Sequence, residues 1–499
     1  MSQCTPPPAT RSRAWLMDMT TYVVALAVFL AAFAVLGIGF EADTFTCFVW
    51  GRQLANGLPM DPVNPVFTSP KILIVLLAAA GQAVPGERGA EYAYAFLVAA
   101  AGAGIVVLTS RLARRIGGTM AAVVAALLTM GHVDLLRHVL TGQSPIFASL
   151  FLLGVLLLAT RQEVRVRDYF WGGALVFAAS LARPEAAVLA GPLAVALYAR
   201  LGWRRPFWPA VVLAFGAAGV AAVLLFNQFG FGSYRYNYEL VMTEMGAMGK
   251  PLPSLLIGFA KAVTRAVLHY ANGLWVMLLL AGVGAGLLVG KDRWRRYIPL
   301  FLFPATTVAM MWALLYRGYL INERCLYYML FIVIALAAGG VGWLGKAASE
   351  RAEFLTGWPP RWRAVIVAAM AVGVMVPAFA SRPLPRYHCG AYRGLEHVGE
   401  MLRAKIGDAT ADRAPLVFDE TAQVMYRLRL PTRPSYRQAV HVLRHKEGDL
   451  PGEIAYYVTD LMPALSELPA TWRLRQVWRD PKSKVALYQR LGATGAEKE

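Results

Sequence analysis

The stretch GFEADTFTCFVWGRQLANG, residues 39–57, decides the fold because it places two acids directly after a long apolar segment. The preceding residues, Thr20 to Phe40, carry no charge. A helix of this length, rising about 1.5 Å per residue, can cross a hydrocarbon core of about 30 Å. Glu41 and Asp43 then stand at the end of that span. The stretch therefore predicts a transmembrane helix followed by an acidic loop at the membrane surface.

The composition places the whole chain in a membrane. Of its 499 residues, 57% are hydrophobic and only 16% are charged, and the mean hydropathy is +0.48, which excludes a soluble globular protein. Further apolar runs predict a mainly α-helical polytopic protein with about eleven transmembrane helices. These runs are residues 91–110, 119–131, 145–160, 169–182, 185–200, 207–227, 272–290, 297–316, 325–345 and 364–381.

Basic residues between the spans predict the orientation, because Lys and Arg in short loops tend to stay in the cytoplasm. With the N-terminus inside, the basic connections also fall inside, provided that residues 71–84 do not cross. This segment would reach only about 21 Å, so it is interpreted as a juxtamembrane or re-entrant helix on the outer side. The inner clusters are Arg111, Arg114 and Arg115; Arg161, Arg165 and Arg167; Arg200, Arg204 and Arg205; residues 291–296; and Lys346 to Arg363.

An odd number of spans places the C-terminus outside, where residues 382–499 lack long apolar runs. The chain therefore divides into a transmembrane module at 1–381, which contains an outer loop at 41–90, and a small soluble α/β domain at 382–499. Within that domain, two segments have helical spacing and four favour strands. The helical segments are residues 394–406 and 434–446, and the strand segments are residues 414–420, 453–460, 473–480 and 483–491.

The net charge of +19 does not indicate a nucleic-acid partner, because much of it lies in the short inner loops. Orientation and anionic lipid headgroups account for it there, so membrane lipids are the expected partners. The alanine-rich and arginine-rich composition, without a eukaryotic targeting signal, favours a bacterial cytoplasmic membrane. The four cysteines show no metal-binding spacing, and no Walker loop, GxGxxG or HExxH motif is present.

Ionisable residues avoid the centres of the predicted spans, where an ion-coupled transporter normally needs them. They gather at the outer ends instead, which predicts a polar chamber at the outer leaflet above an apolar floor for a lipid tail. These residues are Glu41, Asp43, Asp134, Arg137, His138, Arg183, Glu185, Glu239, Glu244, Arg317, Glu323 and Arg324.

The first outer loop resembles that of the GT-C glycosyltransferases, which include protein O-mannosyltransferases, lipid A aminoarabinose transferases and arabinofuranosyltransferases. Bacterial relatives read D-D-A-F-I-x-x-R-x-A-x-x-L-x-x-G, then N-P, then T-S-P-L and an apolar helix. This chain has EADTFTCFVWGRQLANG at 41–57, DPVNP at 61–65 and FTSPKILIVLL at 67–77. The resemblance implies a polyprenyl-phosphate sugar donor and a lipid, glycan or protein acceptor at the outer face.

Three later segments resemble shorter motifs of the same family. TGQSPIFASL at 141–150 resembles S-G-x-E-T-x-L-F, with Gln143 where an acid is common, so Asp134 is the alternative second acid. Arg183-Pro184-Glu185 resembles R-P-E-G, and residues 323–329 resemble R-Y-L-L-P. Gln143 and Glu185 are accordingly assigned to the substrate pocket. Tyr236, within YRYNY at 234–238, either stacks on the sugar or belongs to the interfacial aromatic belt.

The chemistry of sugar transfer from a lipid phosphate asks for a base and for cations. Phosphate is already a good leaving group, so the enzyme must activate the acceptor hydroxyl and neutralise the departing phosphate. Asp43 is the candidate base for in-line displacement, and Glu41 with Asp43 would alternatively bind a divalent cation through oxygen ligands. The candidates for gripping phosphate are Arg183, Arg324, Arg317, Arg137 and Lys71.

Each of these assignments has an ordinary alternative. Glu41 and Asp43 could be solvated acids at a helix end, Arg183 could cap a turn, and Arg324 could reach lipid headgroups. His132 and His138 are expected to make interfacial hydrogen bonds and to bind no metal. A lipid or polysaccharide flippase, another polytopic transporter of envelope precursors, or a non-catalytic membrane partner are the alternative functions.

Overall fold

The computed structural model describes most of the membrane module and parts of the C-terminal region. The described ranges are residues 8–58, 71–85, 88–201, 207–234, 275–289, 294–316, 327–351, 386–406, 416–419, 454–459, 470–482 and 485–491, together with residues 60, 257, 260, 261, 264, 373, 423, 424 and 468.

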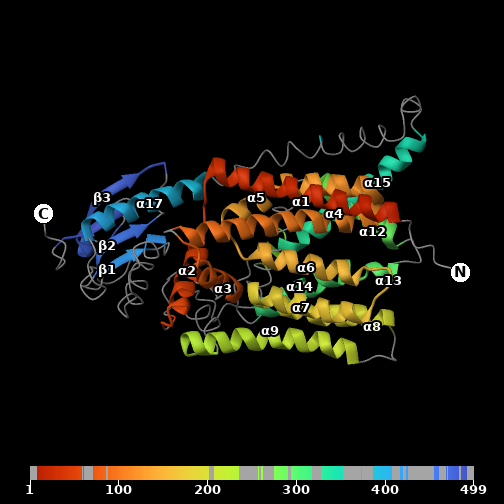
Figure 1. The fold of residues 1–499 in the computed structure, drawn as a ribbon, viewed down its shortest axis with the longest axis horizontal. Helices are drawn as coiled ribbons and strands as arrows, with labels where there is room; N and C mark the ends of the chain where they lie inside the picture. Colours follow the sequence, from red (N-terminus) through yellow and green to blue (C-terminus); the bar gives the residue numbers. More distant parts are fainter. Residues whose placement is uncertain are drawn as a thin grey trace.

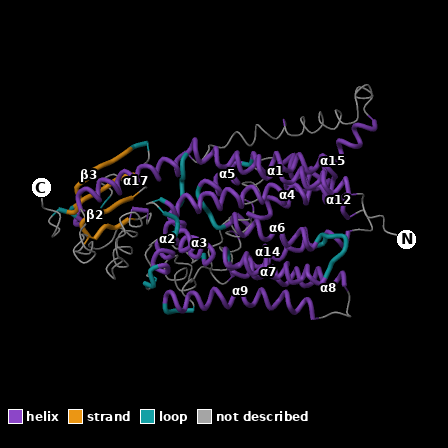
Figure 2. Tube along the Cα trace, in the orientation of Figure 1, coloured by secondary structure: helices purple, strands orange, loops and turns teal. Residues whose placement is uncertain are grey.

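Most of these residues form helices that lie side by side along the long axis of the molecule, with a small sheet at one end (Figure 1, Figure 2). The helices are α1 (Pro8–Leu36), α2 (Ala42–Ala55), α3 (Ile72–Gly81), α4 (Gly89–Gly131), α5 (Val133–Leu140), α6 (Pro145–Ala159), α7 (Val166–Ala182), η1 (Pro184–Leu189), α8 (Ala190–Leu201), α9 (Phe207–Phe231), α12 (Trp275–Val289), α13 (Trp294–Tyr297), α14 (Pro299–Tyr316), α15 (Tyr327–Arg351) and α17 (Arg386–Ile406).

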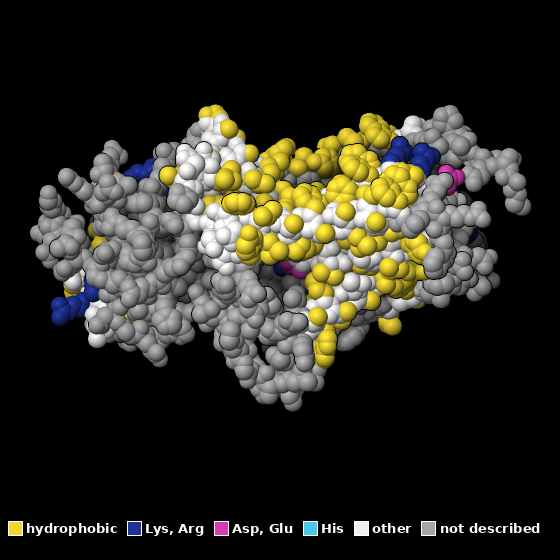
Figure 3. All heavy atoms as spheres, turned by 90° about the horizontal axis from the view of Figure 1, so that it is seen from below, with side chains coloured by type: hydrophobic (Ala, Val, Ile, Leu, Met, Phe, Trp, Pro, Cys, Tyr) yellow, Lys and Arg dark blue, Asp and Glu magenta, His cyan; other side chains and the backbone are white. Residues whose placement is uncertain are grey.

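Within the described part of the chain, four helical segments are long and apolar enough to cross a membrane. They are Ala14–Leu36, Gly89–Gly131, Phe207–Phe231 and Tyr327–Ala347. Hydrophobic side chains cover much of the bundle surface, as expected for a lipid-facing wall (Figure 3). The predicted polytopic helical architecture is confirmed, while the predicted span at 364–381 lies almost entirely outside the described residues.

Helix α4 is a hairpin of two arms rather than one long span. Gly118 breaks it with φ of +81° and ψ of −163°, a conformation that suits glycine. The hydroxyl of Ser110 donates to the carbonyl of Ala122 at 2.9 Å, although a continuous helix would separate these residues by about 18 Å. The two arms correspond to the predicted spans at 91–110 and 119–131.

Charged side chains tie the helices together near this hairpin turn. Asp18 of α1 accepts hydrogen bonds from Arg111, at 2.8 Å, and from Arg114. Arg115 donates to the hydroxyl of Thr160 at 2.9 Å, at the end of α6. Two of the predicted inner clusters therefore meet at one end of the bundle.

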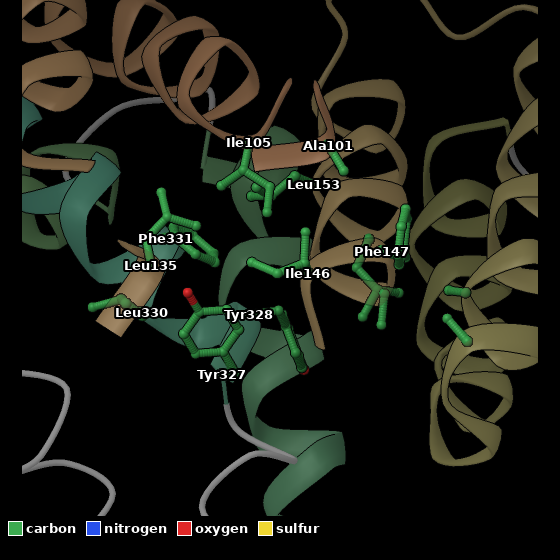
Figure 4. Packing of buried hydrophobic residues seen from close by; sticks show 14 of the residues in the cluster. Ala101, Ile105, Leu135, Ile146, Phe147, Leu153, Tyr327, Tyr328, Leu330 and Phe331 are labelled. Atoms are coloured by element: carbon green, nitrogen blue, oxygen red, sulfur yellow. The ribbon is translucent and has the colours of Figure 1, made fainter. Parts of the chain in front are cut away.

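Glycines allow α12 and α15 to approach each other closely. A Cβ at Gly284 would lie 2.1 Å from the carbonyl oxygen of Leu336, and one at Gly340 would lie 2.3 Å from that of Leu280. Small residues at helix contacts are a main source of cohesion in membrane bundles, because lipid tails are as apolar as the core. Figure 4 shows the neighbouring core, where α5, α6 and α15 meet through Leu135, Ile146, Leu153, Tyr327 and Phe331.

The C-terminal region combines α17 with a four-stranded sheet of order β1-β2-β4-β3. The strands are β1 (Leu416–Asp419), β2 (Ile454–Thr459), β3 (Leu474–Asp480) and β4 (Val485–Arg490). Strand β1 runs parallel to β2, and β4 is antiparallel to both β2 and β3. The four predicted strand segments and the helix at 394–406 are observed, and the helix at 434–446 lies outside the described residues. The sheet lies at the opposite end of the molecule from the start of α1 (Figure 1).

We expect Gly284→Ala to destabilise the bundle, because its methyl group would overlap the backbone of α15. Overpacking of this kind costs about 1–3 kcal/mol. Gly286→Ala is the matched control on the same helix, since a Cβ there meets nothing within 4 Å. Thermal unfolding in detergent should show a lower apparent midpoint for Gly284→Ala only. Equal midpoints for the two variants would contradict the close approach.

Candidate active site

The acidic loop begins where α1 ends. The amide of Gly37 bonds the carbonyl of Phe33, and its φ of +86° turns the chain out of the helix. The amide of Glu41 then donates to the carbonyl of Thr141 at 3.3 Å, which carries the chain onto the turn between α5 and α6. Glu41 is the residue before α2, with φ of −79° and ψ of 162°. Asp43 therefore lies in the first turn of α2, where the helix dipole favours a carboxylate.

Lys71 holds the Asp43 carboxylate. The Nζ of Lys71 lies 3.1 Å from Oδ2 of Asp43, and the side chains are 12% and 26% exposed respectively. Lys71 directly precedes α3, so the pair joins the starts of the two short helices. At ten residues, α3 is too short to cross a membrane, as the sequence predicted. The structure thus places a predicted phosphate ligand on the predicted base.

Thr44 fixes the first turn of α2 from the other side. Its hydroxyl reaches the carbonyl of Gly142 at 3.2 Å, and the Tyr94 hydroxyl donates to the same carbonyl at 2.7 Å. Gly142 has φ of +66°, and a Cβ there would overlap Phe40, so the turn requires glycine. Sequence reasoning missed Thr44 and Tyr94, because no local pattern relates them to Gly142, which lies 98 and 48 positions away.

Gln143 follows this turn and is buried, with 4% of its surface exposed. Neither its side-chain oxygen nor the hydroxyl of Ser144 has a hydrogen-bond partner among the described residues. Both precede Pro145, the first residue of α6. Buried polar atoms without partners are uncommon in proteins and often belong to functional positions. Because Thr44 contacts Gly142, the predicted pocket residue Gln143 lies beside the first turn of α2.

The contact between α2 and α3 is tight. A Cβ at Gly51 would lie 2.7–2.8 Å from three atoms of α3, so glycine is needed there. Burial raises the pKa of the neighbouring Cys47 thiol to about 11, which keeps it protonated at neutral pH. Cys47 is thus a packing residue under the Asp43–Lys71 pair.

Asp134 lies elsewhere, inside the bundle. It is 2% exposed on α5, about 10 Å along the helix from the turn at Thr141. Its amide donates to Nδ1 of His132 at 3.2 Å, and its carbonyl accepts from Nδ1 of His138 at 2.7 Å. His138 also stacks on Tyr327, with ring centroids 4.1 Å apart.

Asp134 and His138 are buried among the helices, and their predicted position in an outer polar chamber stays a prediction. His132 and His138 were expected to make interfacial hydrogen bonds, yet both are buried in the bundle. The apolar spacing of α5 did not indicate that these side chains are buried. The helix continues the second arm of α4 towards the turn before α6. Arg137 is half-buried on α5, and its carbonyl accepts the Thr141 hydroxyl at 2.8 Å.

Arg183 and Glu185 form an ion pair at the start of η1, with side chains 17% and 21% exposed. They line a pocket between α6, η1, α14 and α15 that also contains the hydroxyls of Ser149, Thr307 and Tyr328. Its remaining walls are apolar and include Leu152, Leu189 and Met310. The pocket therefore combines a charged rim with an apolar wall, which suits an amphiphilic ligand. Charged side chains are visible in a hollow of the bundle face in Figure 3.

Sequence reasoning found the charged pair and missed the hydroxyls, which lie singly in apolar segments. Arg317, Arg324, Tyr236 and the segments at 61–65 and 67–70 lie outside the described residues. Among the residues that the structure describes, no group of three His, Cys, Asp or Glu side chains could hold a metal ion. Asp43 is engaged by an ammonium group, so the described donor set does not fit a divalent cation.

Comparison with known proteins gives a structural likeness only. No protein-family model matches the chain, and no curated protein sequence matches it significantly. The crystal structure of ArnT from Cupriavidus metallidurans bound to undecaprenyl phosphate is similar over 97% of this chain and 99% of that chain, with a TM-score of 0.50 and 14% identity. The crystal structure of the same ArnT in the apo state is similar over 98% of this chain and 100% of that chain, with a TM-score of 0.48 and 14% identity.

A zinc and sulfate complex of the Archaeoglobus fulgidus oligosaccharyltransferase is also similar. It matches over 83% of this chain and 57% of that chain, with a TM-score of 0.46 and 16% identity. ArnT is a lipid A aminoarabinose transferase of the GT-C class. The likeness over nearly the full length of both chains shows that this protein has the fold of ArnT, in agreement with the fold that the first outer loop predicted.

We expect Arg183→Leu to destabilise the protein by about 1–3 kcal/mol, because Glu185 would lose its charged partner in a largely buried position. The double variant Arg183→Leu/Glu185→Leu should lose less, since no carboxylate remains to be desolvated. Apparent melting temperatures of the two variants and the wild type in detergent provide the measurement. A double variant that is less stable than Arg183→Leu would show that the pair is not coupled in this way.

Proposed function

We propose that this protein is a membrane glycosyltransferase that takes a sugar from a polyprenyl-phosphate donor and transfers it to an acceptor at the outer face of the cytoplasmic membrane. The observation that carries the proposal is the Asp43–Lys71 pair, 3.1 Å apart at the starts of two short juxtamembrane helices in a GT-C fold. It joins a candidate base to a candidate phosphate ligand.

The two ends of the bundle support the direction of transfer. The Asp18–Arg111–Arg114 cluster marks one end, and α2, α3 and α17 lie towards the other (Figure 1). Since basic residues favour the cytoplasmic side, the Asp43 end is the outer one. The N-terminus then lies inside, and residues 382–499 form an extracytoplasmic domain.

The donor is assigned as a lipid because the bundle offers charge next to apolar surface. The apolar wall of the Arg183 pocket, formed in part by Leu152 and Leu189, would take the first units of a polyprenyl tail. Arg183 would share its guanidinium between Glu185 and the donor phosphate, through the bidentate geometry that arginine favours. The similar structure of ArnT contains undecaprenyl phosphate, which agrees with this substrate class.

Asp43 acts as the base in the proposed reaction. The acceptor hydroxyl oxygen attacks the anomeric carbon of the sugar while the bond from that carbon to the phosphate oxygen breaks. The hydroxyl proton passes to Asp43, and polyprenyl phosphate leaves. Lys71 neutralises the departing phosphate, so part of its interaction moves from the carboxylate to the donor. Donor binding would thereby free Asp43 to accept the proton.

A metal role for Glu41 and Asp43 is the alternative that the experiment must separate. The described residues supply no third ligand for a cation beside Glu41 and Asp43. Asp134 is the candidate for a second catalytic acid. It lies on α5 and is buried inside the bundle, so contact with substrate would require that helix to move. The sugar is assigned only as a hexose or pentose, and the acceptor as a lipid, glycan or protein.

We expect Asp43→Asn to lower sugar transfer by about 10²- to 10⁴-fold, which is the range for loss of a general base. The assay follows radiolabelled sugar from polyprenyl-phosphate donors in membranes that contain equal amounts of folded protein. Lys71→Met should also reduce transfer and should raise KM for the donor. Glu163→Gln, at an exposed position, is the matched control and should leave transfer unchanged.

A chelator arm decides between base and metal ligand. Loss of transfer with EDTA, restored by a divalent cation, would assign Glu41 and Asp43 to a metal. Full transfer by Asp43→Asn would remove Asp43 from the mechanism and direct attention to Asp134. Wild-type protein that transfers sugar from no donor would favour a flippase.

A further inference from the structure

Helix α17 is attached to the membrane bundle along one of its faces. Cys389, Tyr392 and Glu396 are spaced by three and four residues, so they lie on the same side of the helix. Cys389 Sγ donates to the carbonyl of Gly37 at 3.5 Å, and Glu396 pairs with Arg88. Between them, the Tyr392 hydroxyl donates to the Glu91 carboxylate. The C-terminal end of α1 and the N-terminal end of α4 therefore both contact α17.

The bond from Tyr392 to Glu91 is the most buried of these contacts. Glu91 is 1% exposed and Tyr392 is 5% exposed. Burying a carboxylate is costly unless other groups stabilise it. Glu91 lies in the first turn of α4, where the helix dipole favours negative charge, and the phenol adds a charge-assisted hydrogen bond. Removing the phenol would therefore favour separation of α17 from α4.

Tyr392 also touches the helix that carries Asp43. Its ring lies 6.0 Å from the ring of Phe45, at an interplanar angle of 31°. Phe45 is two residues after Asp43 in the first turn of α2, and its ring packs against Phe48, with centroids 5.8 Å apart. The side-chain amide of Gln423 donates to the backbone carbonyl of Tyr392 at 3.0 Å. Tyr392 is thus linked to both the C-terminal region and α2.

We propose that Tyr392 and Glu91 form a latch through which the C-terminal region positions Asp43. Tyr392 is a positioning residue: it acts through Phe45 on the first turn of α2. With the latch closed, the Asp43 carboxylate keeps a fixed orientation towards the acceptor. The catalytic consequence rests on the proposed glycosyltransferase function, whereas the latch itself is a property of the fold.

Kinetics separate positioning from simple stability. Tyr392→Phe keeps the ring on Phe45 and removes the hydroxyl, and we expect kcat per folded molecule to fall about tenfold with little change in KM for the donor. Glu91→Gln should have a similar effect, and the double variant should be no worse than either single variant. Tyr92→Phe, next to Glu91 and 57% exposed, is the matched control. An unchanged kcat for Tyr392→Phe would overturn the positioning role.

Cys389 reports the latch without any turnover. Its thiol is buried against Gly37, and burial raises its pKa, so both effects slow alkylation while α17 is docked. We expect maleimide to modify Cys389 at least about tenfold faster in Tyr392→Phe than in the wild type or Tyr92→Phe. Peptide mapping measures the modification of Cys389. Equal rates in all three proteins would overturn the latch.

A spin label at Asp43→Cys tests positioning directly. The label should become more mobile when Tyr392→Phe is added, and Tyr92→Phe should leave it unchanged. If the wild type transfers no sugar while the label and Cys389 respond as expected, the proposed reaction fails and the latch stands. An active wild type whose label and Cys389 do not respond to Tyr392→Phe overturns the latch alone.

Discussion

Three consecutive residues at the start of α2 are held by three different parts of the chain. Asp43 pairs with Lys71 before α3, Thr44 bonds the turn at Gly142, and Phe45 packs on Tyr392 of α17. A carboxylate that accepts a proton, as Asp43 does in the proposed reaction, needs this kind of support, because small displacements lower the rate steeply. The rest of the site follows from this one helical turn.

The bundle around that turn distributes polarity to match a membrane. Charged networks such as Asp18 with Arg111 lie at one end, and the lipid-facing surface is apolar. Between lipid tails, apolar burial does little to hold helices together, so close packing at small residues such as Gly284 and Gly340 becomes important. Some buried polar groups inside the bundle have specific partners, as with Asp134 on α5, whose amide bonds Nδ1 of His132.

Local patterns in the sequence predicted the parts of the fold that are periodic. The apolar runs indicated the arms of α4, the brevity of residues 71–84 excluded a span, and four short segments of the C-terminal region favoured strands. The sequence placed Asp43 at the end of the first span, whereas the structure places it in the first turn of the next helix, α2. The sequence did not predict that Asp134 is buried. An acid on a short amphipathic helix gives the same sequence pattern whether that helix faces water or a neighbouring helix.

The sequence by itself determined that this is a polytopic helical membrane protein and predicted that Asp43 and Lys71 belong to one loop, because hydropathy, charge and motif spacing are carried along the chain. Only the tertiary structure decided that the two side chains meet, that Gly142 supports Thr44, and that Tyr392 reaches Glu91. These contacts join residues that are 28, 98 and 301 positions apart. No local pattern encodes such distances, since they depend on how the packed helices bring distant segments together.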